Sequence, residues 1–335
     1  MTGPVFVTGG TGLVGGPIVG RLVAQGRRVV ALSRSEHGDA MLSARGAEPV
    51  RGDLFDRERL IDAMRGCEVV YHVAGLNSFC LRDPSPLFRV NVDGALSVVI
   101  GAAAAGVRRL VLTSSAATLG EPPGSVGSEV SPHRGWFLSA YERSKYEGEL
   151  AVFAEGGKAG MEVVSVNPSS VQGPGRATGS ARLLIEYLNG TLKVAVDSRI
   201  SVVDIDDCAD GHLLAEEHGR PGQRYVLSGA SVTVGEALEL LGRLTGLVGG
   251  PRMLPPRLAL AAATVAEAGA RITGRSTHLC RESVRTILHG HRYDGLRAER
   301  ELGLHYRSLG ETLRRTVAWY VREGIVTRAM PAFEG

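Results

Sequence analysis

A tyrosine and a lysine, Tyr141 and Lys145, stand four residues apart in the stretch SAYERSKYEGEL (139–150). Positions i and i+4 share one face of a helix, so both side chains can reach the same site. A phenol with an ordinary pKa of about 10 is a poor acid–base catalyst near neutral pH unless a nearby positive charge stabilises its phenolate. We therefore predict that Tyr141 moves a proton and that Lys145, helped by an oxidised nicotinamide, lowers the pKa of Tyr141.

A serine hydroxyl that could hold a substrate oxygen lies upstream of this pair. LTSSAATLG (112–120) places Ser114 and Ser115 directly after the apolar run RLVL, at the end of a predicted strand. A tyrosine that moves a proton and a serine that holds an oxygen are the parts needed for hydride transfer to or from a C–O centre. We expect Ser115 to be the reacting serine, with Ser114 as the alternative.

Short β-branched runs alternate with helical patterns from the start of the chain and would position these residues. The predicted strands fall at 4–8, 28–33, 68–73, 109–114 and 161–166. Such runs, separated by helices, indicate an α/β fold, a doubly wound parallel Rossmann sheet with helices on both faces. The later segments are short and increasingly helical, which predicts a smaller, mainly helical C-terminal substrate lobe. The predicted nucleotide-binding domain comprises residues 1–170 with 196–228 returning to it, and the lobe comprises 171–195 and 229–335.

A glycine-rich loop, VTGGTGLVGG (7–16), follows the first predicted strand and begins the first helix. Gly9 allows a tight turn, Gly12 lets the backbone approach a pyrophosphate, and Gly15 lets the helix pack closely on the strand. The backbone between these glycines would bind phosphate at the helix start; it includes Thr11, Leu13 and Val14. The position of the loop favours a dinucleotide site over a plain glycine-rich turn.

The residues after the second and third strands bear on the choice of cofactor. The second strand ends in ALSRS, where an NAD site would place an acid and this chain has Arg34. A cation there suits a 2′-phosphate, so we favour NADP(H) over NAD(H), the alternative being a solvated arginine at a strand end. After the third strand, Asp53 and Leu54 could lie against the adenine, although a helix-capping or surface aspartate fits equally well.

These motifs, in this order, resemble an extended short-chain dehydrogenase/reductase of the NAD-dependent epimerase/dehydratase family. The resemblance rests on the glycine loop, RGDLFD, TSSAATLG, YERSKYEGE, NPSSVQGPG (167–175) and VDSRISVVDIDD. It covers most of the chain. Within the family the details resemble the dihydroflavonol-reductase-like branch and the hopanoid-associated sugar-epimerase-like proteins.

The resemblance implies roles for further residues. It implies that Tyr141, Lys145 and Ser115 are catalytic and that Lys145 also binds the nicotinamide ribose. It further implies that Asn91 shapes the active site, the alternative being that Asn91 only makes hydrogen bonds to the backbone. It implies that a further set of residues lies along the cofactor: Val73, Ala74, Gly75, Thr113, Pro168, Ser169 and Ser170. Tyr146, on the same helix as Tyr141, is expected to be a packing residue.

Two departures from the family narrow the expected reaction. Dehydratases carry Asp-Glu after the active-site hydroxyl residue, whereas Ala116 and Ala117 follow Ser115 here, so sugar dehydration is disfavoured. Many nucleotide-sugar enzymes bind diphosphate through an arginine whose place is taken by Ile200. Arg199 lies one residue earlier, and a one-residue offset on a strand faces the opposite side.

The loop AGLNSFCLRDPSP (74–86) is expected to line the substrate pocket with Leu76, Asn77, Phe79 and Cys80. Together with the apolar segment PPRLALAAATVAEAGARITG (255–274), it suits a hydrophobic or ring-containing small molecule, ordinary core packing being the alternative. We predict an NADP(H)-dependent carbonyl reductase or alcohol dehydrogenase. The rivals are a sugar epimerase that retains its cofactor and a non-catalytic nucleotide sensor, which the Tyr–Lys pair disfavours.

Composition sets the remaining expectations. The 335 residues carry a net charge of +3 without a basic block, which argues against nucleic acid as a partner. The four cysteines lack metal or disulfide spacing, so we expect isolated, mostly buried thiols and no metal. The N-terminus has no signal-peptide pattern and the apolar stretches at 95–107 and 258–266 are too short to span a bilayer, which predicts a cytoplasmic protein without a membrane partner. The small-residue run GAAAAG (101–106) would allow a homodimer.

Overall fold

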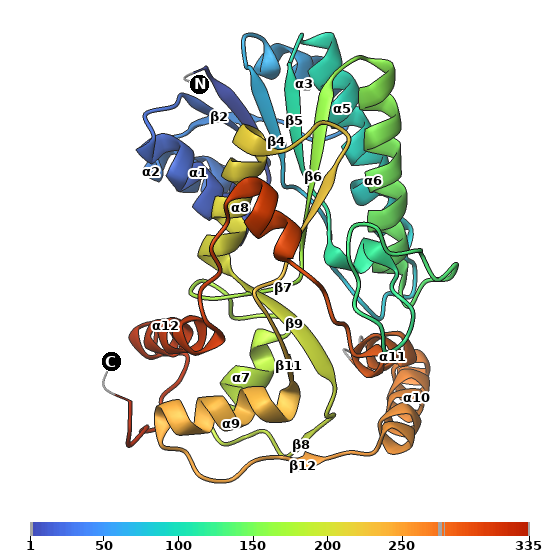
Figure 1. Ribbon diagram of the computed structural model, residues 1–335, viewed down its shortest axis with the longest axis vertical. Helices are drawn as coiled ribbons and strands as arrows, with labels where there is room; N and C mark the ends of the chain where they lie inside the picture. The colour runs from blue at the N-terminus through green and yellow to red at the C-terminus, as the bar shows by residue number, and fades with distance from the viewer. Residues whose placement is uncertain (1–2, 274–276, 278, 334–335) are drawn as a thin grey trace.

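The computed structural model describes residues 3–273, 277 and 279–333. Its largest element is a parallel sheet of seven strands in the order β10-β6-β5-β4-β1-β2-β3 (Figure 1). The strands are β1 (Val5–Thr8), β2 (Val29–Ser33), β3 (Glu48–Arg51), β4 (Val69–His72), β5 (Arg109–Thr113), β6 (Glu162–Pro168) and β10 (Arg224–Leu227). The predicted doubly wound Rossmann sheet is confirmed.

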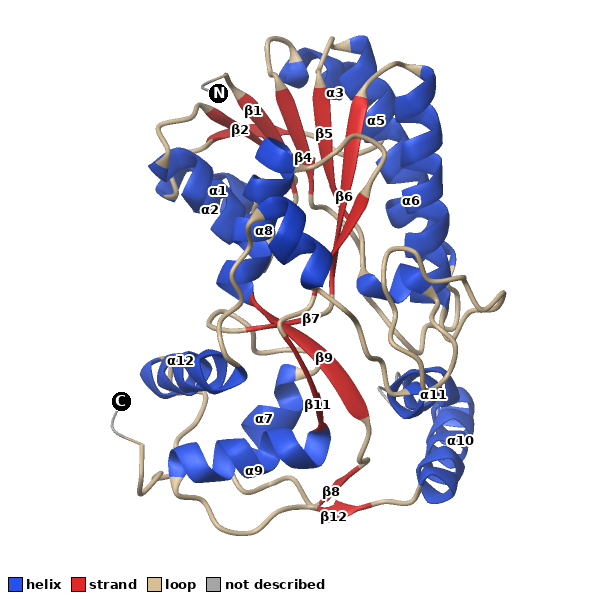
Figure 2. Cartoon of the chain, viewed as in Figure 1, coloured by secondary structure: helices blue, strands red, loops and turns tan. Residues whose placement is uncertain are grey.

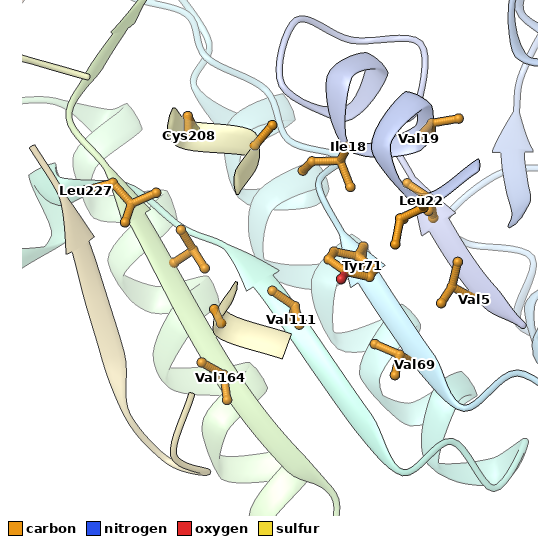
Figure 3. Packing of buried hydrophobic residues seen from close by; sticks show 14 of the residues in the cluster. Val5, Ile18, Val19, Leu22, Val69, Tyr71, Val111, Val164, Cys208 and Leu227 are labelled. Carbon is orange, nitrogen blue, oxygen red and sulfur yellow. The ribbon is translucent and has the colours of Figure 1, made fainter. Parts of the chain in front are cut away.

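Helices cover both faces of this sheet because successive strand residues point to opposite sides. One face packs on α1 (Gly15–Ala24), α2 (Glu36–Ala44) and α8 (Ile205–His218). The opposite face packs on α3 (Arg57–Met64), α5 (Ala95–Ala104) and α6 (Ala140–Lys158). Figure 3 shows the first of these cores, where Tyr71 of β4 and Val111 of β5 lie beneath Ile18 and Leu22 of α1. Both faces are therefore mainly apolar, as the β-branched runs require, although strand residues such as His72 and Ser165 are polar and buried.

The smaller lobe lies below the carboxyl ends of the large sheet (Figure 2). It contains a three-stranded sheet, β11-β9-β7, and a two-stranded sheet, β12-β8, beside its helices. These strands are β7 (Ser170–Gln172), β8 (Val194–Ala195), β9 (Arg199–Asp204), β11 (Ala230–Thr233) and β12 (Arg252–Met253). The helices are α7 (Ala181–Leu188), α9 (Val234–Thr245), α10 (Pro256–Thr273), α11 (Arg281–His289) and α12 (Leu309–Arg322).

Three aspartates at the start of α8 tie the two parts together. Asp204 caps the helix and accepts a hydrogen bond of 2.7 Å from Thr312 of α12. Asp206 pairs with Arg21 of α1 at 2.8 Å and also with Arg315 of α12. The third, Asp207, accepts from the backbone N–H of Arg307. The VDIDD stretch thus joins the first and last helices of the chain.

A continuous helical run at Ser85–Ala104 contains most of the apolar stretch that begins at residue 95. It consists of α4 (Ser85–Phe88), the π-helical turn η1 (Arg89–Gly94) and α5. By length and composition alone this stretch could cross a membrane, so the expectation that it is too short was wrong. Half of the run is buried inside the protein, and its α5 part packs between α3 and α6, which is the position of a core helix.

Two of the four cysteines form a disulfide, which corrects the prediction of isolated thiols. Cys80, in the loop after β4, is bonded to Cys280 at the start of α11, with their Cα atoms 5.7 Å apart. Cys67 and Cys208 are free and buried, as expected. The paired cysteines are separated by 200 residues in the sequence, so only the tertiary fold brings them together.

Candidate active site

The glycine loop has the geometry that a dinucleotide site requires. Gly9 has a φ of +72°, which favours glycine, and a Cβ there would lie 2.6 Å from the backbone N of Ala74. A Cβ on Gly15 would lie 2.1 Å from the Gly9 carbonyl oxygen, so the helix start could not pack against the loop. At Gly12 the only atom close to such a Cβ is that same oxygen, at 3.2 Å, which leaves room beside the helix N-terminus.

The residues Ser115, Tyr141 and Lys145 come together at the carboxyl end of β5. Ser115 caps the 3₁₀ turn η2 (Ala116–Leu119), and Tyr141 and Lys145 lie in the first turns of α6, which Ser139 caps. Lys145 is half-buried, and its Nζ donates a hydrogen bond of 2.8 Å to the carbonyl oxygen of Thr113. Burial lowers the pKa of this ammonium to about 8.

The pKa of Tyr141 is set mainly by burial in the protein without cofactor. Burial raises it above its usual value, and this effect outweighs a hydrogen bond with Ser115 and the positive charge of Arg176, which both lower it. The lowering predicted for the site with an oxidised nicotinamide and Lys145 stays a prediction, because these effects are those of the protein without cofactor. The charge that acts on the phenol comes from Arg176, in the loop after β7, which the sequence analysis did not single out.

Arg176 faces the site without a carboxylate to neutralise it among the described residues. Its guanidinium donates a hydrogen bond of 3.3 Å to Ser180, while its buried Nε has no partner in the described part of the chain. Burial lowers the pKa of Arg176, and the nearby Tyr320 and Tyr141 hydroxyls partly offset this. A signal was present in the sequence, because Arg176 directly follows NPSSVQGPG.

Two buried contacts hold Lys145 and its surroundings in place. The Thr113 hydroxyl lies 2.8 Å from Nε2 of His212, whose Nδ1 lies 2.6 Å from the Cys208 carbonyl oxygen, so Nδ1 carries the proton and Nε2 accepts from Thr113. Burial lowers the pKa of His212 to about 4, which keeps the ring neutral. The contact with His212 holds Thr113 in place, and the carbonyl oxygen of Thr113 accepts the hydrogen bond from Lys145.

Asn91 lies on η1 and is fully used in hydrogen bonding. Its Oδ1 accepts from the Leu76 N–H at 2.8 Å, and its Nδ2 donates to the Leu76 carbonyl and the Ser144 hydroxyl, both at 2.9 Å. It therefore fixes the loop after β4 against α6. A Cβ on Gly75 would lie 3.3 Å from Asn91 Oδ1 and 3.6 Å from Lys145 Nζ, so the backbone at Gly75 passes close to both side chains.

The remaining predicted cofactor residues are dispersed around the glycine loop and the strand ends. Val73 and Ala74 follow β4, and the Ala74 N–H donates to Thr8 Oγ1 at 3.2 Å. Arg34 is exposed at the end of β2. Asp53 is also exposed and accepts from the Phe55 N–H, whereas Leu54 is buried in the core.

The residues after β6 offer free polar atoms. Pro168 ends this strand, and Ser169 has a buried hydroxyl without a hydrogen-bond partner in the part of the chain that the structure describes. Ser170 lies 3.2 Å from the Ser180 hydroxyl. The hydroxyl of Ser114 is also buried and has no hydrogen-bond partner among the described residues.

The loop after β4 reaches the tyrosine, as predicted. The rings of Phe79 and Tyr141 lie 5.8 Å apart at a tilt of 52°. The disulfide joins the next residue, Cys80, to α11, and Glu282 of α11 accepts hydrogen bonds from the backbone of Cys80 (2.9 Å) and Ala140 (2.6 Å). Tyr146 packs instead against His133 and Phe137, at ring distances of 4.7 and 5.4 Å, which is the expected packing role.

These residues fit a nicotinamide dinucleotide. The glycine loop leaves space at the start of α1, and Lys145 of α6 lies beside Gly75 in the loop after β4. The hydroxyls of Ser114 and Ser169, which have no partner among the described residues, lie at the ends of β5 and β6. Gly9, Thr11, Gly12, Leu13 and Val14 would hold the diphosphate, and Lys145 would hold a ribose.

Comparison with known proteins agrees with this geometry. Residues 5–228 match the model of the NAD dependent epimerase/dehydratase family. The chain is 34% identical to Sterol demethylase protein B of Methylococcus capsulatus, over 96% of this chain and 99% of that one. It is 33% identical to a putative dihydroflavonol 4-reductase of Synechocystis, over 96% and 95% of the two chains. The crystal structure of gox2253 superposes with a TM-score of 0.85 at 27% identity, covering 97% and 99%.

The chain therefore belongs to the NAD-dependent epimerase/dehydratase family, and it is an enzyme of the extended short-chain dehydrogenase/reductase type. The family resemblance seen in the sequence motifs is confirmed. Members of this family use a nicotinamide cofactor, which matches the fit of the glycine loop.

Proposed function

We propose that this protein is an NADP(H)-dependent oxidoreductase that interconverts a carbonyl and a secondary alcohol on a small apolar or ring-containing substrate. The observation that carries the proposal is the convergence of the Tyr141 and Ser115 side chains, whose interaction favours the phenolate, beside the aromatic ring of Phe79 and the charge of Arg176. It puts a proton donor and an oxygen-binding hydroxyl next to an apolar surface.

In this reaction a bound nicotinamide would supply the hydride. Tyr141 donates the proton to the carbonyl oxygen, and Ser115 holds that oxygen through its hydroxyl. Both groups are preorganised in a buried site, where hydrogen bonds to a developing oxyanion stabilise it more than they would in water. Lys145 binds the ribose and Asn91 positions the surrounding loop.

Three observations support the choice of cofactor and substrate class. Arg34 is exposed at the end of β2 and has no ion pair within the described residues, so its charge is available for a 2′-phosphate. Phe79 gives the site an apolar wall. The names of the two relatives, which refer to a sterol and to a dihydroflavonol, suggest ring-containing substrates.

The proposal is tested by assaying a panel of ring-containing ketones and nucleotide sugars with NADPH and NADH. A reductase consumes NADPH one-for-one with the substrate, whereas a redox-neutral epimerase changes the substrate without net consumption. Absorbance and chromatography of the products distinguish the two. Replacing Tyr141 with Phe should remove most turnover, by roughly 10²–10⁴-fold, and leave cofactor affinity nearly intact.

Tyr146→Phe is the matched control, because this tyrosine lies on the same helix and packs away from the site. Its activity should stay close to that of the unmodified enzyme. Retained turnover in Tyr141→Phe would rule out the mechanism. A cytoplasmic location and a homodimer remain predictions from the sequence, and light scattering of the purified protein would test the second.

A further inference from the structure

A second group of ionisable side chains lies apart from the Tyr–Lys pair. Glu121 follows η2, while His289 ends α11 and His291 follows it. One ligand atom from each of these three side chains lies within 4.8 Å of the other two. The segments that carry them are joined by backbone hydrogen bonds, from Gly127 N to Arg292 O at 2.8 Å and from Asp294 N to Gly127 O at 2.9 Å.

The burial of this group is unusual for such polar side chains. The side chains of Glu121 and His289 are only 1% and 4% exposed. Glu121 Oε1 lies 2.6 Å from His291 Nδ1, but Glu121 Oε2 and His289 Nε2 are buried without a hydrogen-bond partner among the described residues. Leaving a buried donor or acceptor unpaired destabilises the fold, because its hydrogen bonds to water are lost without replacement.

The hydrogen bonding at His291 is also incomplete. Its Nδ1 lies 2.6 Å from Glu121 Oε1 and 2.8 Å from the Tyr293 hydroxyl. A single ring nitrogen cannot make a full hydrogen bond with both oxygens at once. Either Glu121 Oε1 or the Tyr293 hydroxyl is therefore left without a full hydrogen bond to His291.

We propose that Glu121, His289 and His291 bind a divalent transition-metal ion, with Zn²⁺ the best match. Imidazole nitrogen and carboxylate oxygen are its preferred protein ligands besides thiolate, at about 2.0–2.2 Å and in tetrahedral geometry. Ligand atoms at that distance lie roughly 3.3 Å from each other. Glu121 Oε1 and His289 Nε2 are 3.4 Å apart, which matches this edge, whereas Glu121 Oε1 and His291 Nδ1, now 2.6 Å apart, must separate when the ion binds.

Metal binding would give the unpartnered His289 Nε2 a ligand bond. His289 Nε2 and a Glu121 oxygen become ligands, and His291 Nδ1 becomes the third when the proton that it shares with Glu121 is released. The fourth position is taken by water, for which the Tyr293 hydroxyl beside His291 is a hydrogen-bond partner.

The ion would join the loop after η2, which carries Glu121, to the segment after α11, which carries His291. That helix also holds Glu282, which accepts from the backbone at the start of α6, and Cys280, which is bonded to Cys80. The role of the ion is therefore structural, and it helps to keep α11 against the active site. This site is independent of the proposed reaction, because it needs neither cofactor nor substrate.

The test uses the full-length protein, purified without chelator for metal analysis and then stripped by dialysis against a chelator. Titration with Co²⁺ should give the intense visible absorption of a four-coordinate ion at about one equivalent per chain, and Zn²⁺ should displace it. Binding should weaken as the pH falls, since a proton is released. Absence of saturable Co²⁺ binding to the stripped protein would overturn the proposal.

Variants locate the site. His289→Gln and Glu121→Gln should each weaken Co²⁺ binding by roughly a hundredfold or more, whereas His305→Gln, at an exposed position, should bind as the unmodified protein does. Circular dichroism of the metal-free variants controls for folding. Equal binding by all of them would show that the metal binds elsewhere and that the cluster is only a hydrogen-bond network.

Discussion

The guanidinium of Arg176 lies close enough to the Tyr141 hydroxyl for its positive charge to lower the pKa of that phenol, while Lys145 donates to the Thr113 carbonyl. Arg176 comes from the loop after β7 and Tyr141 from the first turn of α6, so the pair spans the boundary between the sheet and the lobe. The electrostatics of the proposed proton donor are thus set partly by the lobe that would hold the substrate.

Replacing Arg176 with Gln should therefore raise the pKa of Tyr141, because the charge that favours its phenolate is lost. In the reducing direction, the alkaline limb of the kcat profile should move to higher pH, since Tyr141 stays protonated longer. We expect kcat near neutral pH to fall by roughly tenfold through the loss of oxyanion stabilisation. Arg182→Gln, an exposed neighbour paired with Glu186, should leave the profile unchanged. An unshifted alkaline limb in Arg176→Gln would contradict the assignment.

Replacing Arg34 with Asp should raise KM for NADPH far more than KM for NADH. The lost charge-assisted hydrogen bond to the 2′-phosphate and the new repulsion together predict an effect of at least roughly tenfold. Steady-state kinetics with both cofactors measure it. Arg257→Asp, exposed on α10 and remote from β2, serves as the charge-matched control. Equal responses to NADPH and NADH would mean that Arg34 does not contact the phosphate.

Lys145 makes folding stability depend on pH in the cofactor-free protein. Burial lowers its pKa from 10.5 to about 8. Below pH 8 both folded and unfolded states carry the charge, and the cost of burying it is present in full, at about 3 kcal/mol. As the pH rises from 8 toward 10.5 the folded state becomes neutral first, so this cost is relieved.

The free energy of unfolding of the unmodified protein should accordingly rise between about pH 7 and pH 10 relative to that of Lys145→Met. Urea titrations at both pH values measure the difference. Lys158→Met, at an exposed site paired with Glu155, should show no such pH-dependent difference. If the free energy of unfolding of Lys145→Met changes with pH in the same way as that of the unmodified protein, the ammonium of Lys145 is solvated.

Loss of the disulfide should change the KM for the substrate more than the affinity for the cofactor. The disulfide holds the residue next to Phe79 against α11, so Cys80→Ser should raise KM for the carbonyl substrate by several-fold and leave cofactor affinity unchanged. Thiol titration of the unfolded, unreduced protein should detect only Cys67 and Cys208. Cys67→Ser, at a buried free thiol, controls for the loss of a cysteine. Detection of four thiols would show that the bond does not form.

The parts of the site that sequence could predict are those whose contacts are local or follow from strand order. The positive φ of Gly9 and the close packing at Gly15 follow from the position of the loop between a strand and a helix. Tyr141 and Lys145 share a face because they are one helical turn apart. Ser115 meets them because β5 ends at the ligand side of a parallel sheet.

The residues that sequence reasoning missed depend on long-range packing. Cys80 and Cys280 are 200 residues apart, and Glu121 meets His291 across 170 residues. Neither pair has a spacing that indicates contact. Burial raises the pKa of Tyr141 in the protein without cofactor, and the extent of that burial cannot be read from a motif. The adenine contact of Asp53 and the 2′-phosphate contact of Arg34 stay predictions.

The path of the chain limits where this enzyme could be cut into fragments that fold on their own. After leaving the sheet at β6 the chain builds part of the lobe, returns as α8 and β10, departs again, and returns once more as the π-helical turn η3 (Ala298–Leu302). Ala298, Leu302 and Leu304 are buried in the same core as β1 and α1. A fragment ending near residue 228, although it contains the whole family match, would expose that core, so the catalytic half is not an autonomously folding module and cannot be transplanted without its C-terminal third.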